Sequence, residues 1–150
     1  MPTLFDPAAR AAMFARFDKL TPRTPRRWGS MTPEQMVFHL GTQVSHVLGE
    51  IRIPPRKVPP VFHWPLFHWL IIDSGMPWPK STPTAPQLLS DAPGELGPLV
   101  AQLKERTERL AAKGEASAAG VHPAFGPLSG AQTGRLLWRH WHHHLTQFGC

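Results

Sequence analysis

The chain has 150 residues, a formal net charge of +6, 41% hydrophobic residues and one cysteine, Cys150. This length and hydrophobic content predict a single globular domain over residues 1–150. One cysteine excludes an internal disulfide and is typical of a reducing compartment, so we expect a cytoplasmic protein. The N-terminus lacks the pattern of a signal peptide. The apolar run 61–72 is interrupted by histidine and proline and is shorter than the roughly 20 residues of a membrane span, so no membrane segment is expected.

The positive charge favours an anionic partner, but the basic residues are scattered. They form two small groups: Arg23, Arg26 and Arg27, and Arg52, Arg56 and Lys57. No recognition helix, RNA-binding signature or zinc finger accompanies them. Nucleic acid is therefore the least favoured partner, and a small-molecule substrate is expected instead.

Two helix starts are predicted in the first 50 residues. Asp6 followed by Pro7 is typical of an N-cap with proline at the first helical position, and Thr21-Pro22 ends this helix. Thr32-Pro33-Glu34-Gln35 is typical of a capping box. The second helix should run to about Leu48, with Gly49 near its end.

Residues 52–93 contain ten of the 18 prolines, which forbids a long helix there. We predict a long proline-rich connection between the second and third helices, packed because it is apolar; whether it acts as a lid stays open. Residues 66–73 are expected to be a short helical or extended piece, and residues 86–90 a turn of helix.

Three polar side chains of this connection need an interpretation. His63 and His68 are interpreted as surface or interface residues rather than ligands. For Lys80, in Pro77-Trp78-Pro79-Lys80, two interpretations stay open: a contact to an anionic ligand, or a lysine in solvent.

The third helix is predicted from the apolar spacing of Leu96 to Leu110, with Pro98 in its first turn. Residues 114–120 are expected to form a flexible loop. Residues 121–127 should form a rigid approach in which His122 is extended, because Pro123 follows it; the role of His122 stays open. Ser129 is expected to cap the last helix. No alternating strand pattern is found, so the prediction is an all-α four-helix bundle.

Four of the nine histidines lie between positions 140 and 144. On a helix, His140 and His144 are one turn apart with Cβ atoms about 5–6 Å from each other, so both can reach one ion at about 2.0–2.1 Å. His143 and Gln147 fall on the same stripe. Trp138 and Leu145 fall on the opposite side, where we expect the proline-rich connection or a partner subunit to cover them.

The second helix carries a matching polar stripe that includes His39, Gln43 and His46. Taken alone, His39 is either a hydrogen-bonded core histidine or a ligand. Read with the last helix, it favours a metal site made of His39, His140 and His144. His46 lies about 10 Å from His39 along the helix axis, so it is expected to line the pocket. Gln43, Gln147 and His143 are expected as outer or substrate contacts.

Several segments together resemble the DinB-like four-helix-bundle superfamily, in a branch of uncharacterised function. They are Met31-Thr32-Pro33-Glu34-Gln35-Met36 followed by His39-Leu40, Pro77-Trp78-Pro79-Lys80, His122-Pro123-Ala124-Phe125-Gly126, and His143-His144-Leu145 followed by Gln147-Phe148-Gly149. The resemblance covers nearly the whole chain. It implies a bundle that is often a homodimer, with a divalent metal held by the three histidines that map onto His39, His140 and His144.

The resemblance also implies a range of activities. Characterised relatives include S-transferases that use low-molecular-weight thiols such as bacillithiol, mycothiol or glutathione. We therefore expect a metal-dependent enzyme, a thiol S-transferase or a hydrolase, with zinc or nickel as the ion and a thiol as cosubstrate. The alternative is a non-catalytic, metal-stabilised bundle that serves as an interaction or dimerisation module.

Overall fold

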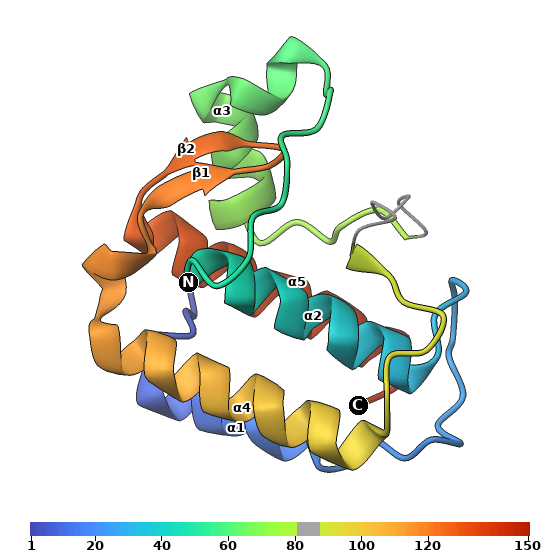
Figure 1. Cartoon of the computed structure of the whole chain (residues 1–150). Helices are drawn as coiled ribbons and strands as arrows, with labels where there is room; N and C mark the ends of the chain where they lie inside the picture. Colours follow the sequence, from blue (N-terminus) through green and yellow to red (C-terminus); the bar gives the residue numbers. More distant parts are fainter. Residues whose placement is uncertain (81–87) are drawn as a thin grey trace.

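A computed structural model describes residues 1–80 and 88–150 of the chain. Its longest elements are four helices: α1 (Pro7–Phe17), α2 (Pro33–Val47), α4 (Leu96–Lys113) and α5 (Gly130–Gln147). Figure 1 shows these helices lying alongside one another. The described residues are therefore mainly helical, as predicted, with one small sheet in addition. Within those same residues, no helix is both long and apolar enough to cross a membrane.

The predicted helix starts are confirmed by their side-chain caps. Asp6 accepts hydrogen bonds from the backbone N–H groups of Ala8 and Ala9. Thr32 and Gln35 form a complete capping box at the start of α2. Ser129 caps α5 and forms the same reciprocal pair with Gln132. These caps satisfy N–H groups that have no partner inside the helix, and so they fix where each helix begins.

One hydrophobic core joins the four long helices. α2 packs along α4, and α5 contacts both α1 and α2. The fully buried core side chains include Met13, Phe17, Met36, Leu40, Leu103, Leu110, Trp141 and Leu145. Trp138 packs against this same core. The expectation that Trp138 and Leu145 await cover by the proline-rich connection or a partner is therefore wrong, because both pack in the core that α1 helps to form.

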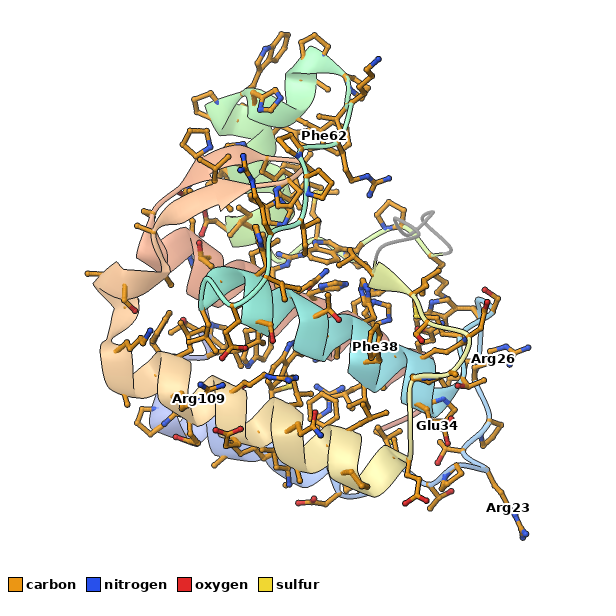
Figure 2. The ribbon with its side chains drawn as sticks, in the orientation of Figure 1. Arg23, Arg26, Glu34, Phe38, Phe62 and Arg109 are labelled. Atoms are coloured by element: carbon orange, nitrogen blue, oxygen red, sulfur yellow. The ribbon has the colours of Figure 1, made fainter. Side chains whose placement is uncertain are left out.

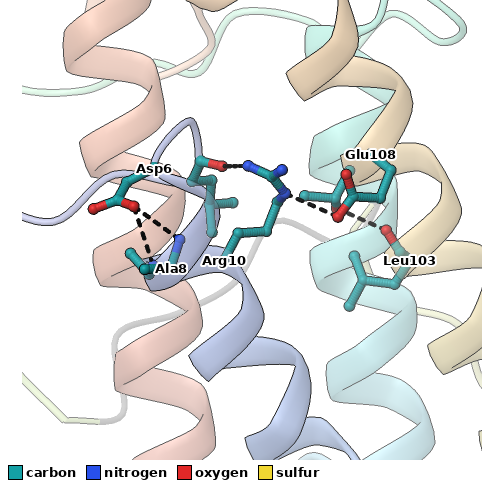
Figure 3. A network of polar contacts seen from close by, with 8 residues as sticks. Asp6, Ala8, Arg10, Leu103 and Glu108 are labelled. Carbon is teal, nitrogen blue, oxygen red and sulfur yellow. Dashed lines mark hydrogen bonds and ion pairs between the residues drawn. The ribbon is translucent and has the colours of Figure 1, made fainter.

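Polar contacts tie the start of α1 to α4. The Arg10 guanidinium donates to the carbonyl of Leu4 at 2.9 Å and pairs with Glu108 at 2.9 Å (Figure 3). Lys104 pairs with Asp18 at the other end of α1. Such exposed ion pairs contribute little energy each, so they set the alignment of α1 on α4 more than they stabilise it.

The connection between α2 and α4 contains an arm of three short helical pieces: η1 (Pro60–His63), α3 (Pro65–His68) and the π-helical turn η2 (Trp69–Asp73). Figure 1 shows this arm on the side of α2 and α5 that faces away from α4 and α1. The helical alternative for residues 66–73 is thus confirmed, whereas the turn expected at residues 86–90 lies partly outside the described residues. The ring of Phe62, labelled in Figure 2, lies 4.6 Å from that of Phe67 and 5.9 Å from that of Phe125.

The two histidines of the arm differ in burial. His63 is exposed, as expected. His68 is only 8% exposed, and its Nε2 donates to the carbonyl of Phe62 at 2.8 Å. The interpretation of His68 as a surface residue is therefore wrong: this side chain closes a turn inside the arm, and its imidazole is held by a backbone carbonyl rather than by solvent.

A short hairpin corrects the expectation of a fold without strands. β1 (Gly120–His122) pairs antiparallel with β2 (Gly126–Leu128). Strands of three residues are too short to show alternation in the sequence, which is why the pattern missed them. His122 is extended, as expected, and its Nδ1 accepts the backbone N–H groups of Ala124 and Phe125. In the segment expected to be a loop, Glu115–Ala118 form a 3-10 turn, η4.

Candidate metal centre

His39 comes from the middle of α2, and His140 and His144 come from consecutive turns of α5. The Nε2 atom of His140 lies 3.2 Å from that of His39 and 2.9 Å from that of His144. One ligand nitrogen from each residue lies within 4.8 Å of the other two. The structure therefore brings together the three imidazoles that the sequence proposed as one cluster, from helices about 100 residues apart.

The cluster is enclosed but not sealed. His39 is 3% exposed and His144 is 8% exposed, whereas His140 is only partly buried. His39 and His144 are therefore shielded from water, whereas His140 keeps some contact with it.

Gln147 determines the tautomer of His144. Its amide Nε2 donates to the backbone carbonyl of Trp28 at 2.8 Å, and a carbonyl can only accept. The amide Oε1 of Gln147 must then face Nδ1 of His144, which lies 2.8 Å away. Nδ1 of His144 therefore carries the proton, and in the neutral ring Nε2 presents a lone pair to the centre.

Gln43 does the same for the other two rings. Its Oε1 accepts from Nδ1 of His140 at 2.6 Å, and its Nε2 lies 3.5 Å from Nε2 of His39. An amide nitrogen only donates, so Nε2 of His39 is an acceptor. His140 thus presents an unprotonated Nε2, and the contact with Gln43 favours the same state for His39. Gln43 and Gln147 therefore each contact a histidine of the cluster.

Protonation of one ring would remove the repulsion between the lone pairs of the three Nε2 atoms, but the surroundings of the rings oppose protonation. The pKa of His39 is lowered to about 3 by burial and then by nearby His144, with a backbone hydrogen bond of Leu88 acting in the opposite direction. Burial also lowers the pKa of His144 to about 4, although its hydrogen bond with Gln147 raises it. Burial and the neighbouring histidines hold the pKa of His140 well below its ordinary value. All three rings are therefore neutral at pH 7.

Three neutral imidazoles with converging lone pairs fit a divalent metal ion. A tetrahedral ion with bonds of about 2.0–2.1 Å needs nitrogen atoms about 3.3–3.4 Å apart, and the separations of 2.9 and 3.2 Å need only a small opening to reach this. Imidazole ligands suit zinc and nickel among other ions. Three protein ligands leave at least one coordination position free for another molecule.

Two indole rings lie beside the centre, and sequence reasoning did not place them there. The ring of Trp78 lies 5.6 Å from that of His140 and 5.9 Å from that of His143. The ring of Trp28 meets His143 edge-on at 5.8 Å. Each Trp lies in an irregular segment, so no periodicity indicated which helix it faces.

Only one of the other two histidines expected at the pocket, His143 and His46, lies beside the cluster. The ring of His143 lies 5.4 Å from that of His144, at the edge of the centre. His46 instead accepts the backbone N–H of Ile53 through Nδ1 at 3.2 Å. It also lies near His122, whose pKa is lowered to about 4 by burial, then by His46, His68 and Arg56. His46 thus serves the start of the proline-rich connection, and no hydrogen bond joins it to the three histidines among the described residues.

Comparisons of the chain with protein-family models, curated proteins and solved structures gave no match.

Proposed function

We propose that His39, His140 and His144 bind one divalent metal ion, and that this ion is the reactive centre of a thiol S-transferase or hydrolase. We also propose that the four long helices form a bundle of the DinB-like type. The observation that carries the metal proposal is the pair of glutamine amides, Gln43 and Gln147, whose hydrogen bonds leave all three Nε2 atoms unprotonated and facing one point.

The chemistry follows from the open position. A bound ion lowers the pKa of a coordinated water or thiol and so supplies a nucleophile at neutral pH. The protein's own contribution is to orient the ligands: Gln43 and Gln147 fix the tautomers, and outer partners of this kind support metal affinity. The half-buried ring of His143 and the indole of Trp78 are placed to contact a molecule that reaches His140.

The alternative is a metal-stabilised module without catalysis. The burial of His39 and His144 favours it, because a structural site is closed to solvent. The partial exposure of His140 favours the enzyme. A cobalt-substituted protein separates the two, because a thiol that enters an open position changes the visible spectrum of the ion.

The test of metal binding uses protein purified without a histidine tag, so that no added imidazoles compete. Metal analysis should find about one divalent ion per chain in the parent protein and little in His140→Ala or His144→Ala. His142→Ala is the matched control, because His142 lies on the same helix, is exposed and bonds to Arg16 instead. Full metal content in both variants of the cluster would refute the proposal.

Given a metal-loaded protein, glutathione, mycothiol and bacillithiol should each be offered with an electrophilic acceptor, and ester or amide substrates without a thiol. Turnover that is lost in His140→Ala but retained in His142→Ala would support the enzyme. Full metal content with no turnover and no spectral response to any thiol would favour the non-catalytic module.

A further inference from the structure

Lys80 is a positive charge held in a defined place near the metal centre. Its Nζ lies 4.7 Å from the centre of the Trp28 ring. Residues 74–90 and 19–33 contain no acidic residue, and among the described residues the ion pairs do not include Lys80. Contact with an indole face favours this position for a flexible ammonium, and no carboxylate among the described residues forms an ion pair with it there.

Trp28, whose ring lies next to the Lys80 ammonium, is linked to the three histidines by hydrogen bonds. Its carbonyl accepts from Gln147, whose other amide atom accepts from His144. Its ring edge meets His143, and Trp78 meets the same His143 ring at 5.9 Å. Two half-buried indoles therefore flank His143, with the ammonium over one of them. Here "the rim" means Trp28, Trp78, Lys80 and His143.

We propose that the rim binds the carboxylate end of a planar ligand, with the carboxylate on Lys80 and the flat apolar part against the indoles. One part of this inference rests on the proposed function, namely that the other end of the ligand reaches the metal. One ammonium matches the charge of one carboxylate, and aromatic faces favour a planar body. The substrate class is thus a small aromatic or conjugated acid that carries a metal-binding group.

Several basic residues elsewhere are already engaged by other groups of the protein. Lys104 pairs with Asp18, and Arg106 and Arg109 pair with Glu50, so a ligand anion would have to displace a carboxylate. Arg139 lies near the Trp78 ring, but it is buried and donates to the carbonyl of Met76. Lys80 is exposed, and it is free to accept a charged ligand without breaking an ion pair.

The first experiment measures binding to the zinc-loaded protein by calorimetry. The probes are 4-carboxybenzohydroxamate and its neutral counterpart 4-carbamoylbenzohydroxamate, which share the chelating group and the ring. The parent protein should prefer the carboxylate, and Lys80→Gln should weaken it by about three- to fivefold, the range of an exposed ion pair, with less than a twofold change for the amide. Lys80→Arg should restore the preference.

The matched control is Lys19→Gln, which removes the same charge at another exposed lysine. A loss of the preference in Lys19→Gln equal to that in Lys80→Gln would mean that net charge alone acts, and this would overturn the inference. Equal affinity of the parent protein for the two probes would also overturn it.

A second experiment needs no metal. In metal-free protein, benzoate should change the tryptophan fluorescence at lower concentration than benzamide, and Lys80→Gln should abolish the difference. If the chain takes up no ion, the proposed function fails, while the benzoate experiment still tests whether the rim binds a carboxylate. If the ion binds but benzoate and benzamide act alike, the rim proposal fails and the metal proposal stands.

Discussion

Nδ1 of His144 donates to Oε1 of Gln147 across 2.8 Å, one turn along the same helix. This bond decides which nitrogen of the imidazole faces α2. Because the other end of the amide is held by the Trp28 carbonyl, the amide cannot rotate to offer its nitrogen instead. A loop of the chain that lies before α2 therefore controls the tautomer of His144 on the last helix.

We expect Gln147→Leu to weaken metal binding by about 10- to 100-fold, the usual cost of losing an outer partner of a ligating histidine. Leucine cannot accept from Nδ1, so the tautomer of His144 is no longer fixed. The affinity can be measured by competition with a chromophoric chelator.

Two further variants control this result. Gln147→Glu keeps an acceptor oxygen for Nδ1 of His144 and should bind metal more tightly than Gln147→Leu, even though its carboxylate cannot donate to Trp28. Gln102→Leu makes the same change at an exposed position of α4 and should have no effect. A Gln147→Leu protein that binds metal as tightly as the parent would show that the amide does not set the tautomer.

Metal-free protein should lose stability as the pH falls from about 6.5 to about 4. The folded-state pKa values of His39, His122 and His144 are lowered to about 3, 4 and 4 from the ordinary value of 6.5. In this window the unfolded chain binds more protons than the folded one, so the free energy of unfolding decreases with decreasing pH. Each such histidine contributes up to about 1.4 kcal/mol per pH unit.

Urea unfolding followed by tryptophan fluorescence at pH 7.5, 6.0 and 5.0 measures this slope. His122→Asn keeps an acceptor for the backbone N–H groups of Ala124 and Phe125 but removes one titrating group, so its slope should be shallower. Stability that is constant between pH 7.5 and 5.0 would mean that these histidines are not held neutral by burial.

Trp141→Ala should destabilise the fold by about 3–5 kcal/mol, the range for removing a large buried aromatic side chain. Trp141 is 0% exposed, and its ring meets that of Phe17 edge-on at 5.2 Å. Trp64 is 58% exposed, so Trp64→Ala should change the free energy of unfolding by less than about 0.5 kcal/mol. Thermal unfolding of the two variants side by side checks the contrast, and equal losses would contradict the assigned core.

Gly130→Ala should destabilise the start of α5 by about 1–3 kcal/mol, as over-packing does. A Cβ atom there would lie 1.9 Å from the backbone carbonyl oxygen of Glu115, which cannot rotate away as a side chain could. Gly97→Ala in α4 meets nothing within 4 Å and should be neutral or stabilising, because alanine favours the helix. Chemical unfolding of both variants measures the difference; a neutral Gly130→Ala would show that η4 and α5 are not in contact.

Local sequence determined the helix starts and the identity of the three clustered histidines. Asp6, Thr32 and Ser129 act within three residues of themselves, so their effect can be read without knowing the fold. The spacing of His140 and His144 sets their distance through the helix repeat alone. The addition of His39 was inferred from polar stripes on two helices, and the structure shows the convergence.

The tertiary structure alone decided which tryptophan and lysine side chains lie near those histidines. Trp28, Trp78 and Lys80 lie in proline-rich segments, where no repeat fixes the direction of a side chain. The contacts of Trp28 and Trp78 with α5 span more than 60 residues of the sequence, and Lys80 contacts Trp28 across 52 residues. His46 belongs to the same stripe as His39 by periodicity, yet a backbone N–H of the following loop binds it. Periodicity gives the direction of a side chain from its own helix, whereas the partner in that direction depends on how distant segments pack.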